Sequence, residues 1–183
     1  MAQVTLLCGP AGAGKSTLAR ELEAAGALVL SYDRESWARG VRDGLPSVEL
    51  MQQIDAELHE RLAEAIARDR SVVLDASLST RAMRDRWRMR CGAMGVPVEL
   101  VVVRAPLDVL LERVRARTPG PDAVRLDEEV LAAYVAAFEW PGEHEAHRTV
   151  DTGAEPATVP TAGAPDPDPS RRARPGAPGR DRR

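Results

Sequence analysis

One segment near the N-terminus places glycines, a lysine and a hydroxyl side chain at fixed spacing. It reads Gly9-Pro10-Ala11-Gly12-Ala13-Gly14-Lys15-Ser16 and fits the pattern G-x-x-x-x-G-K-[ST] at every fixed position. In such a loop the glycines let backbone N–H groups turn inward around a phosphate, the lysine bridges phosphate oxygens, and the serine hydroxyl coordinates Mg²⁺. Thr17 opens the helix expected next, whose positive end favours bound phosphate. The segment therefore predicts a binding site for a nucleoside triphosphate with Mg²⁺.

The lysine in this loop is the only one in the chain. Of the 25 basic residues, 24 are Arg and one is Lys15. Coincidence in an Arg-rich composition is one explanation. We favour a chemical one, because a compact ammonium fits between phosphates where a planar guanidinium does not.

Two aspartates follow apolar runs that predict strands. Asp33 comes two residues after residues 27–31, and Asp75 ends residues 71–75. Ligands of parallel sheets bind beyond the carboxyl ends of the strands, so both carboxylates are candidates for the site. Asp75 is suited to hold a Mg²⁺-bound water or to orient Asp33 or an Arg, with a loop cap as the alternative. The alternative to a catalytic role for Asp33 is that its side chain caps the helix that follows.

The elements that position these residues alternate along the chain. Apolar runs predict strands over residues 3–8, 27–31, 71–75 and 97–103, and residues 147–151 are a candidate for a short fifth strand. Helices are predicted over residues 16–25, 48–68, 80–94, 107–117 and 126–138. Alternating strands and helices indicate an α/β fold, with a parallel sheet covered by helices on both faces.

Composition excludes several classes of protein. Hydrophobic residues make up 44% and charged residues 29% of the 183 residues, as in a soluble globular domain. No apolar run approaches the ~20 residues of a membrane span, and the N-terminus lacks a basic leader. Cys8 and Cys91 form no metal-ligand pattern. We therefore expect a cytoplasmic protein without a membrane partner.

The net charge of −3 is unevenly distributed. Residues 153–183 carry six Arg and four acidic residues, so residues 1–152 are acidic and are not a broad basic surface for nucleic acid. Residues 153–183 are rich in Pro and Gly and poor in large apolar side chains, which predicts a disordered tail. A contact of its Arg cluster with nucleic acid or an acidic partner is the alternative to a solvated tail. We expect one domain, residues 1–152, followed by this tail.

Further motifs carry a family resemblance over about residues 3–152. Besides residues 9–17 they are Leu30-Ser31-Tyr32-Asp33, Val72-Val73-Leu74-Asp75-Ala76-Ser77, Val98-Glu99-Leu100-Val101 with Ala105-Pro106, Leu111-Glu112-Arg113 through Arg117, and Phe138-Glu139-Trp140-Pro141 with Glu145. With these motifs the chain resembles the small P-loop kinases that include the 5′-kinase domain of polynucleotide kinase, zeta toxins and chloramphenicol phosphotransferase. Similar chains are often labelled AAA-family ATPases.

The resemblance implies a three-layer α/β/α fold with five parallel strands in the order 2-3-1-4-5 and a small helical lid. It implies ATP and Mg²⁺ as cofactors and Asp33 as the general base that faces an acceptor hydroxyl. The family often has an Arg three residues after this Asp. Here that position is Ser36, while Arg34 and Arg39 lie nearby.

Arginines on two predicted helices are further candidates. Arg113 and Arg117 lie four apart on one helix face, and resemble lid arginines that stabilise charge on a transferring phosphoryl group. The helix breaker 118–121 (Thr-Pro-Gly-Pro) would follow them as a hinge, and a solvated basic helix end is the alternative. The second set is Arg81, Arg84, Arg86, Arg88 and Arg90. These are spread around their helix, so we favour a surface helix over a groove for polynucleotide phosphate.

Two smaller groups complete the prediction. His144 and His147, beside acidic residues, would allow a metal site, although a surface turn is the favoured interpretation. Trp37 is expected to pack near the acceptor pocket.

Three functions remain open from the sequence. The leading one is a kinase that transfers the γ-phosphoryl group of ATP to a hydroxyl of a small-molecule or nucleic-acid acceptor, as a monomer or weak homodimer. The second is an ATPase switch that acts on a protein partner, and the third is a polynucleotide 5′-hydroxyl kinase. Ras-like GTPases need a guanine-reading Asn-Lys-x-Asp, which cannot exist here in its usual form because the single lysine lies in the phosphate loop. Nucleic acid is thus a possible but not a favoured partner.

Overall fold

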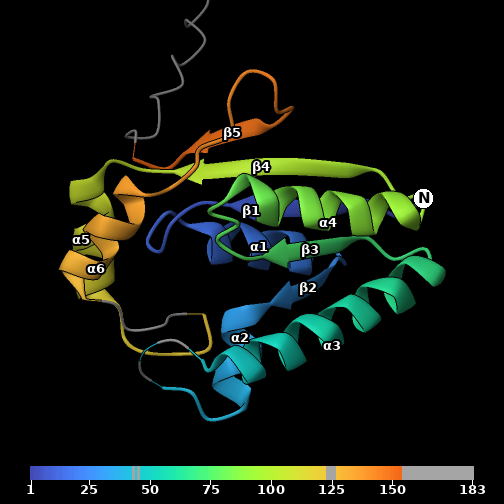
Figure 1. Ribbon diagram of the computed structural model, residues 1–183, viewed down its shortest axis with the longest axis horizontal. Coiled ribbons are helices and arrows are strands. Elements are labelled where there is room, and N and C mark those ends of the chain that lie inside the picture. Colours follow the sequence, from blue (N-terminus) through green and yellow to red (C-terminus); the bar gives the residue numbers. More distant parts are fainter. Residues whose placement is uncertain (43, 45, 123–126, 154–183) are drawn as a thin grey trace, which may run out of the picture.

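A computed structural model describes residues 1–42, 44, 46–122 and 127–153 of the chain. Its centre is a five-stranded sheet in the order β2-β3-β1-β4-β5 (Figure 1). The strands are β1 (Val4–Cys8), β2 (Leu28–Ser31), β3 (Val72–Asp75), β4 (Val98–Arg104) and β5 (Arg148–Asp151). Every neighbouring pair is parallel. The predicted fold class and strand order are therefore confirmed.

Six helices connect and cover these strands within the described residues. They are α1 (Lys15–Ala24), α2 (Tyr32–Ala38), α3 (Val48–Ala67), α4 (Arg81–Ala93), α5 (Leu107–Ala116) and α6 (Glu128–Ala136). In Figure 1, α4 lies on the near face of the sheet and α1 on the far face. None of the described helices is both long and apolar enough to cross a membrane.

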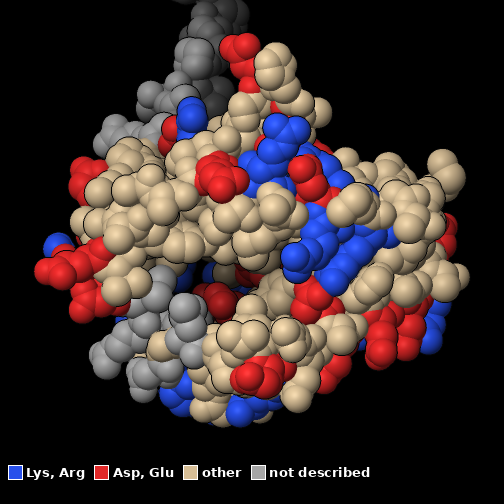
Figure 2. Space-filling view, in the orientation of Figure 1, with Lys and Arg blue, Asp and Glu red and all other residues tan. Residues whose placement is uncertain are grey.

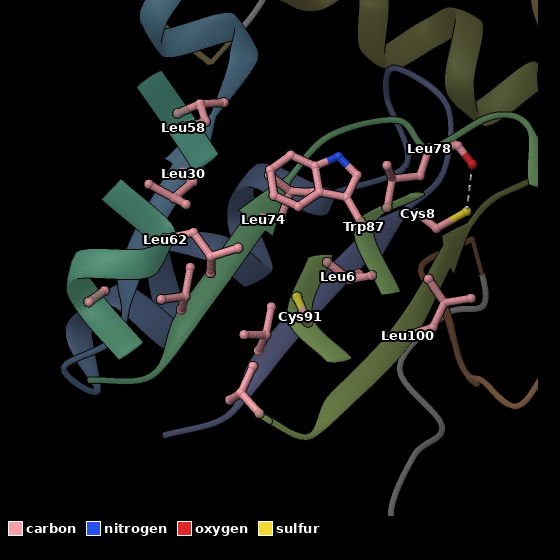
Figure 3. Close-up of a cluster of buried hydrophobic side chains, with 14 of the residues drawn as sticks. Leu6, Cys8, Leu30, Leu58, Leu62, Leu74, Leu78, Trp87, Cys91 and Leu100 are labelled. Carbon is pink, nitrogen blue, oxygen red and sulfur yellow. Dashed lines mark hydrogen bonds between the residues drawn. The ribbon is translucent and has the colours of Figure 1, made fainter. Parts of the chain in front are cut away.

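Two hydrophobic cores lie on the two faces of the sheet. Alternate residues of β1 serve different cores, since Leu6 and Cys8 pack toward α3 and α4 while Leu7 packs toward α1, α5 and α6. This is the period of two that a strand imposes on its side chains. Figure 3 shows the first core, in which Trp87 from α4 lies among leucines from α3 and four strands. Burial on both faces explains why β1, β2, β3 and β4 are mostly apolar, whereas the edge strand β5 is largely exposed and mostly polar.

The start of α2 shows which residue caps this helix. This helix begins at Tyr32, and the Ser31 hydroxyl accepts a hydrogen bond from the Arg34 backbone N–H at 3.4 Å. Ser31 is therefore the N-cap, and Asp33 lies inside the first turn. The interpretation of Asp33 as the helix cap is wrong, and its carboxylate remains available for other contacts.

The predicted disordered tail lies outside the described residues, except for Gly153.

Candidate active site

The phosphate loop joins β1 to α1, and two of its glycines are fixed by close backbone contacts. A Cβ atom on Gly9 would lie 2.1 Å from the carbonyl oxygen of Val103 in β4. One on Gly12 would lie 2.9 Å from the carbonyl oxygen of Leu110 in α5. Gly14 adopts a positive φ of 99° directly before α1. The loop can thus curl tightly against β4 and α5, which a chain with side chains at these positions could not do.

Lys15 is the first residue of α1 and lies over the loop that precedes it. Its ammonium donates a hydrogen bond to the Pro10 carbonyl at 3.0 Å. Burial lowers the pKa of Lys15, while the charges of Asp75 and Asp33 act in the opposite direction. Both carboxylates therefore lie within electrostatic reach of the ammonium. Ser16, half-buried, and Thr17, exposed, follow in the first turn of α1.

Asp75 and Asp33 lie at the carboxyl ends of neighbouring strands. Asp75 ends β3 and is 6% exposed, and it pairs in register with Ser31, the last residue of β2. Asp33 is exposed and follows β2 by two residues. Figure 2 shows a hollow beside these strand ends, with acidic atoms visible inside it. The sheet thus brings together the two aspartates that the sequence singled out.

The pKa of Asp33 is raised, although its side chain reaches solvent. The largest cause is burial, because the surrounding protein limits hydration of the carboxylate. The charge of Lys15 lowers this pKa and that of Asp75 raises it, and Arg117 adds a smaller lowering effect. The charges of Asp75 and Arg117 thus act on both Lys15 and Asp33, so the four side chains lie within electrostatic reach of one another.

Arg113 on α5 and Arg117, which directly follows that helix in an extended conformation rather than continuing its face, have different surroundings. Arg113 donates to the Gly12 carbonyl at 3.1 Å, to the Thr152 hydroxyl at 2.8 Å and to the Thr152 carbonyl at 2.7 Å. The Thr152 hydroxyl in turn donates to the carbonyl of Ala13 at 2.8 Å. Arg113 therefore fastens the phosphate loop to the end of β5. Arg117, the C-cap of α5, is the one whose charge acts on Lys15 and Asp33.

Thr152 was not foreseen from the sequence. It lies 139 residues from Ala13 and 39 from Arg113 along the chain, and no local motif marks it. Only its position directly after a predicted strand places it at the ligand-binding edge of the sheet.

A cavity of about 580 Å³ opens beside the phosphate loop. It is bounded by α1, by the C-terminal half of α5 and by the ends of β4 and β5, and its lining includes Thr17, Leu18, Val103, Arg113, Val150 and Thr152. Apolar side chains with a few polar groups and a volume of this order are typical of small-ligand pockets.

The arginine-rich helix α4 differs from the prediction of a surface helix. Arg84 is 1% exposed and pairs with the buried carboxylate of Glu145. Arg88 pairs with the same carboxylate, and Arg90 pairs with Asp55 on α3. The basic surface over α4 in Figure 2 is accordingly interleaved with acidic atoms. Because three of the five arginines serve internal ion pairs, α4 is a poor groove for polynucleotide phosphate.

Two residues near Asp33 on α2, Ser36 and Arg34, have hydrogen-bond partners of their own. Ser36 is buried and donates its hydroxyl hydrogen to the Tyr32 carbonyl at 2.7 Å. Arg34 donates to Asp122 at 2.7 Å and to Glu23 at 3.1 Å. Arg34 thus joins α2 to α1 and to the connection between α5 and α6.

Trp37, His144 and His147 are the remaining residues that the sequence singled out. Trp37 is half-buried, with the Arg42 guanidinium 4.1 Å above its ring. His144 and His147 are exposed, and His144 lies in a turn. Among the described residues, no group of three or more His, Cys, Asp or Glu could hold a metal ion.

The strand order and the phosphate loop together define a P-loop nucleotide-binding fold of the kinase-like type. The chain belongs to the AAA domain family, whose model matches residues 4–141. A comparison with curated proteins gave no match.

Solved structures share this fold at low sequence identity. A gluconokinase from Sinorhizobium meliloti 1021 is 22% identical with a TM-score of 0.60, covering 84% of each chain. The tunicamycin resistance protein of Deinococcus radiodurans is 20% identical with a TM-score of 0.56, covering 83% of this chain and 87% of that one. A chain of the Pnkp1/Rnl/Hen1 RNA repair complex is 17% identical with a TM-score of 0.65, covering 74% of this chain and 43% of that one. Kinases are thus among the proteins that share the architecture, and the suspected family is confirmed.

Proposed function

We propose that this protein is a kinase that transfers the γ-phosphoryl group of ATP to a hydroxyl of a small-molecule acceptor. The observation that carries the proposal is the position of an exposed carboxylate, Asp33, just after β2 and beside Asp75 at the end of β3, where its charge also reaches Lys15 of the phosphate loop. A kinase needs one group that binds the donor phosphates and another that faces the acceptor hydroxyl. A simple ATPase needs no carboxylate for an acceptor.

The phosphate loop and Asp75 have the features of a Mg²⁺–triphosphate site. The close contacts of Gly9 and Gly12 with the backbone of β4 and α5 shape a loop that only glycines permit. Ser16 and Asp75 supply the hard oxygen ligands that Mg²⁺ prefers, Asp75 directly or through water. Bound there, the ion would bridge phosphate oxygens and offset charge that develops during transfer. In this proposal Lys15 holds the β- and γ-phosphates.

Asp33 is the proposed general base. A carboxylate with a raised pKa is a stronger proton acceptor than an ordinary aspartate, and general bases work best when their pKa approaches the operating pH. Its exposure just beyond the end of β2 leaves it accessible to an acceptor. Asp33 would orient the hydroxyl and take its proton as the bond to phosphorus forms.

Arg117 and Arg113 have separate roles in this proposal. Arg117, whose charge acts on both Lys15 and Asp33, would stabilise the transferring phosphoryl group. Arg113 would keep the loop in position through Gly12 and Thr152. The cavity beside them, of about 580 Å³, would take the nucleoside.

A small acceptor is favoured over a polynucleotide. Strong polynucleotide binding needs several free cationic groups along a track, but Arg84, Arg88 and Arg90 on α4 are held by Glu145 and Asp55. Two of the proteins with a similar fold are named a gluconokinase and a tunicamycin resistance protein. These names are consistent with phosphoryl transfer to, or resistance against, a small molecule.

The proposal extends to organisation and location. We place the active domain at residues 1–152, acting as a monomer or weak homodimer in the cytoplasm. The free, buried thiols of Cys8 and Cys91 suit a reducing compartment.

³¹P NMR with Mg-ATP tests the function directly. The protein is measured alone and then with pooled acceptors, namely sugars, hydroxylated antibiotics and 5′-hydroxyl oligonucleotides. We expect a new phosphate-ester signal that depends on a small-molecule acceptor and disappears in a Lys15→Ala variant. Slow release of ADP and phosphate, unchanged by every acceptor, would instead favour the ATPase switch. A signal only with oligonucleotides would favour the polynucleotide kinase.

A further inference from the structure

Arg84 is a fully buried guanidinium that donates three hydrogen bonds, two to a carboxylate and one to a backbone carbonyl. Its Nε and Nη2 atoms donate to the two carboxylate oxygens of Glu145 at 2.7 and 2.9 Å. Its Nη1 atom donates to the backbone carbonyl of Leu78 at 3.0 Å. Arg84 is 1% exposed and Glu145 7%. One side chain of α4 thus joins the segment between α6 and β5 to the connection between β3 and α4.

The Leu78 carbonyl that Arg84 holds belongs to a strained turn. Leu78 has a φ of +47°, in the left-handed region that bulky residues rarely adopt. Such a conformation persists only where the surrounding structure holds it. Besides the bond from Arg84, the Leu78 carbonyl accepts a hydrogen bond from the Cys8 thiol at 3.5 Å, drawn as a dashed line in Figure 3. Two buried donors therefore fix this carbonyl.

The same turn lies between two parts of the proposed active site. Leu78 follows Asp75 by three residues. The neighbouring carbonyl of Ser77 accepts a hydrogen bond from the backbone N–H of Gly9 at 3.0 Å, where the phosphate loop begins. A change in the turn would therefore shift Asp75 and the start of the loop together.

We infer that Arg84 and Glu145 form a positioning pair, which holds the Leu78 turn and through it sets Asp75 and Gly9 in the geometry that phosphoryl transfer requires. This inference rests on the roles proposed above for Asp75 and the phosphate loop. Neither Arg84 nor Glu145 is placed in contact with substrate. They act through the backbone of residues 77 and 78.

Stability alone is a poor reason for this pair. Removing one partner of a buried ion pair is costly, but replacing both with apolar residues of similar size is often neutral or stabilising. An apolar pair, however, cannot donate a hydrogen bond to the Leu78 carbonyl. The positioning role and a purely structural role therefore make different predictions for the double replacement.

The test compares a double variant of the full chain, Arg84→Met/Glu145→Leu, with a control, Arg88→Met. Arg88 lies on the same helix and also contacts Glu145, but forms no described bond to the Leu78 turn. We expect the double variant to unfold cooperatively at a temperature near that of the parent. Its kcat should fall by about 10²-fold, the loss typical of a catalytic group displaced by 1 Å. The KM for the acceptor should stay unchanged, and Arg88→Met should keep the parent kcat.

A second measurement does not need an acceptor. Because Asp75 is proposed to hold Mg²⁺, the double variant should lose most of the Mg²⁺ dependence of ADP affinity in calorimetry, and Arg88→Met should retain it. If the parent transfers no phosphoryl group to any acceptor, the kinase proposal fails, and this measurement alone decides the positioning role. A folded double variant that matches the parent in both kcat and Mg²⁺ dependence overturns the inference.

A charge-conserving variant covers the case in which the double variant does not fold. Arg84→Lys keeps a positive charge beside Glu145 but lacks the planar fork that serves Glu145 and Leu78 together. We expect the same direction of change in kcat and in Mg²⁺ dependence. Parent values in a folded Arg84→Lys protein would also overturn the inference.

Discussion

Asp33 illustrates how burial and neighbouring charges together set the pKa of a single residue. Burial and Asp75 favour its neutral form, whereas Lys15 and Arg117 favour its ionised form. The result is a raised pKa on an exposed side chain. A carboxylate tuned in this way is suited to accept a proton and then release it.

Replacing Asp33 tests its role as the base. In Asp33→Asn the amide cannot accept the proton, so kcat should fall by about 10²- to 10⁴-fold, the range for loss of general base catalysis. Affinity for Mg-ADP should remain close to that of the parent, because the nucleotide is held by the loop. Steady-state kinetics and calorimetry on the same samples measure the two quantities. Loss of both together would show that Asp33 has a structural or metal-related role instead.

The pH dependence of kcat/KM in the parent protein is a second test of Asp33 as the general base. A base must be deprotonated to act, so kcat/KM should fall as the pH falls through the pKa of Asp33. Because that pKa is raised from 3.8, the acid limb should lie above pH 3.8. The residual activity of Asp33→Asn should lack this limb, and an unchanged limb would assign it to another group.

At the scale of elements, Arg113 on α5 joins the phosphate loop to the residue that follows β5. Three hydrogen bonds from Arg113 connect the loop to the end of β5, and the loop glycines leave no space between the loop, β4 and α5. The loop is therefore held by two strands and a helix in addition to its own α1.

Arg113 and Arg115 on α5 form a matched pair for testing this connection. Arg113→Met leaves the carbonyls of Gly12 and Thr152 without their charged donor, and one hydrogen bond to a charged group contributes about 1.5–3 kcal/mol. We expect Mg-ADP affinity to fall about tenfold in calorimetry, equivalent to about 1.4 kcal/mol. Arg115→Met removes only an exposed ion pair with Glu128, which contributes little, and should leave the affinity unchanged. Equal losses in both variants would contradict the prediction.

The sequence predicted most elements because their signals are local. Continuous apolar runs marked the strands, and the loop pattern fixed the β1–α1 junction. Arg84 was misplaced because its spacing on α4 resembles that of a surface residue. Its partner Glu145 lies 61 residues away, and no local pattern links the two. The same holds for Thr152, whose contacts with Ala13 and Arg113 exist only once the sheet is assembled.

At the scale of the whole molecule, Glu145 connects distant parts of the chain and should couple stability to pH. Hydrogen bonds from Arg84 and, less strongly, from Arg88 hold its pKa at about 2, against an ordinary value of 4.5. A carboxylate with a lowered pKa in the folded state stabilises the fold above its unfolded-state pKa. This contribution is lost progressively as the pH falls from 4.5 towards 2.

Chemical denaturation at several pH values checks this prediction. The difference in free energy of unfolding between the parent and Glu145→Gln should be largest above pH 4.5 and should shrink as the pH falls. Glu99→Gln, which removes a surface ion pair with Arg148, is the control and should differ little from the parent at any pH. A Glu145→Gln difference that stays constant with pH would argue against a strongly lowered pKa.

The single lysine gives the molecule an unusual chemical property. Across these 183 residues the Lys15 side chain is the only primary amine carried by a side chain. Burial lowers the pKa of Lys15, which increases its unprotonated, nucleophilic fraction at neutral pH. An acylating reagent should therefore modify one internal peptide, and bound nucleotide should shield it. The mass of that peptide would report the occupancy of the phosphate loop, even in a mixture and without knowledge of the acceptor.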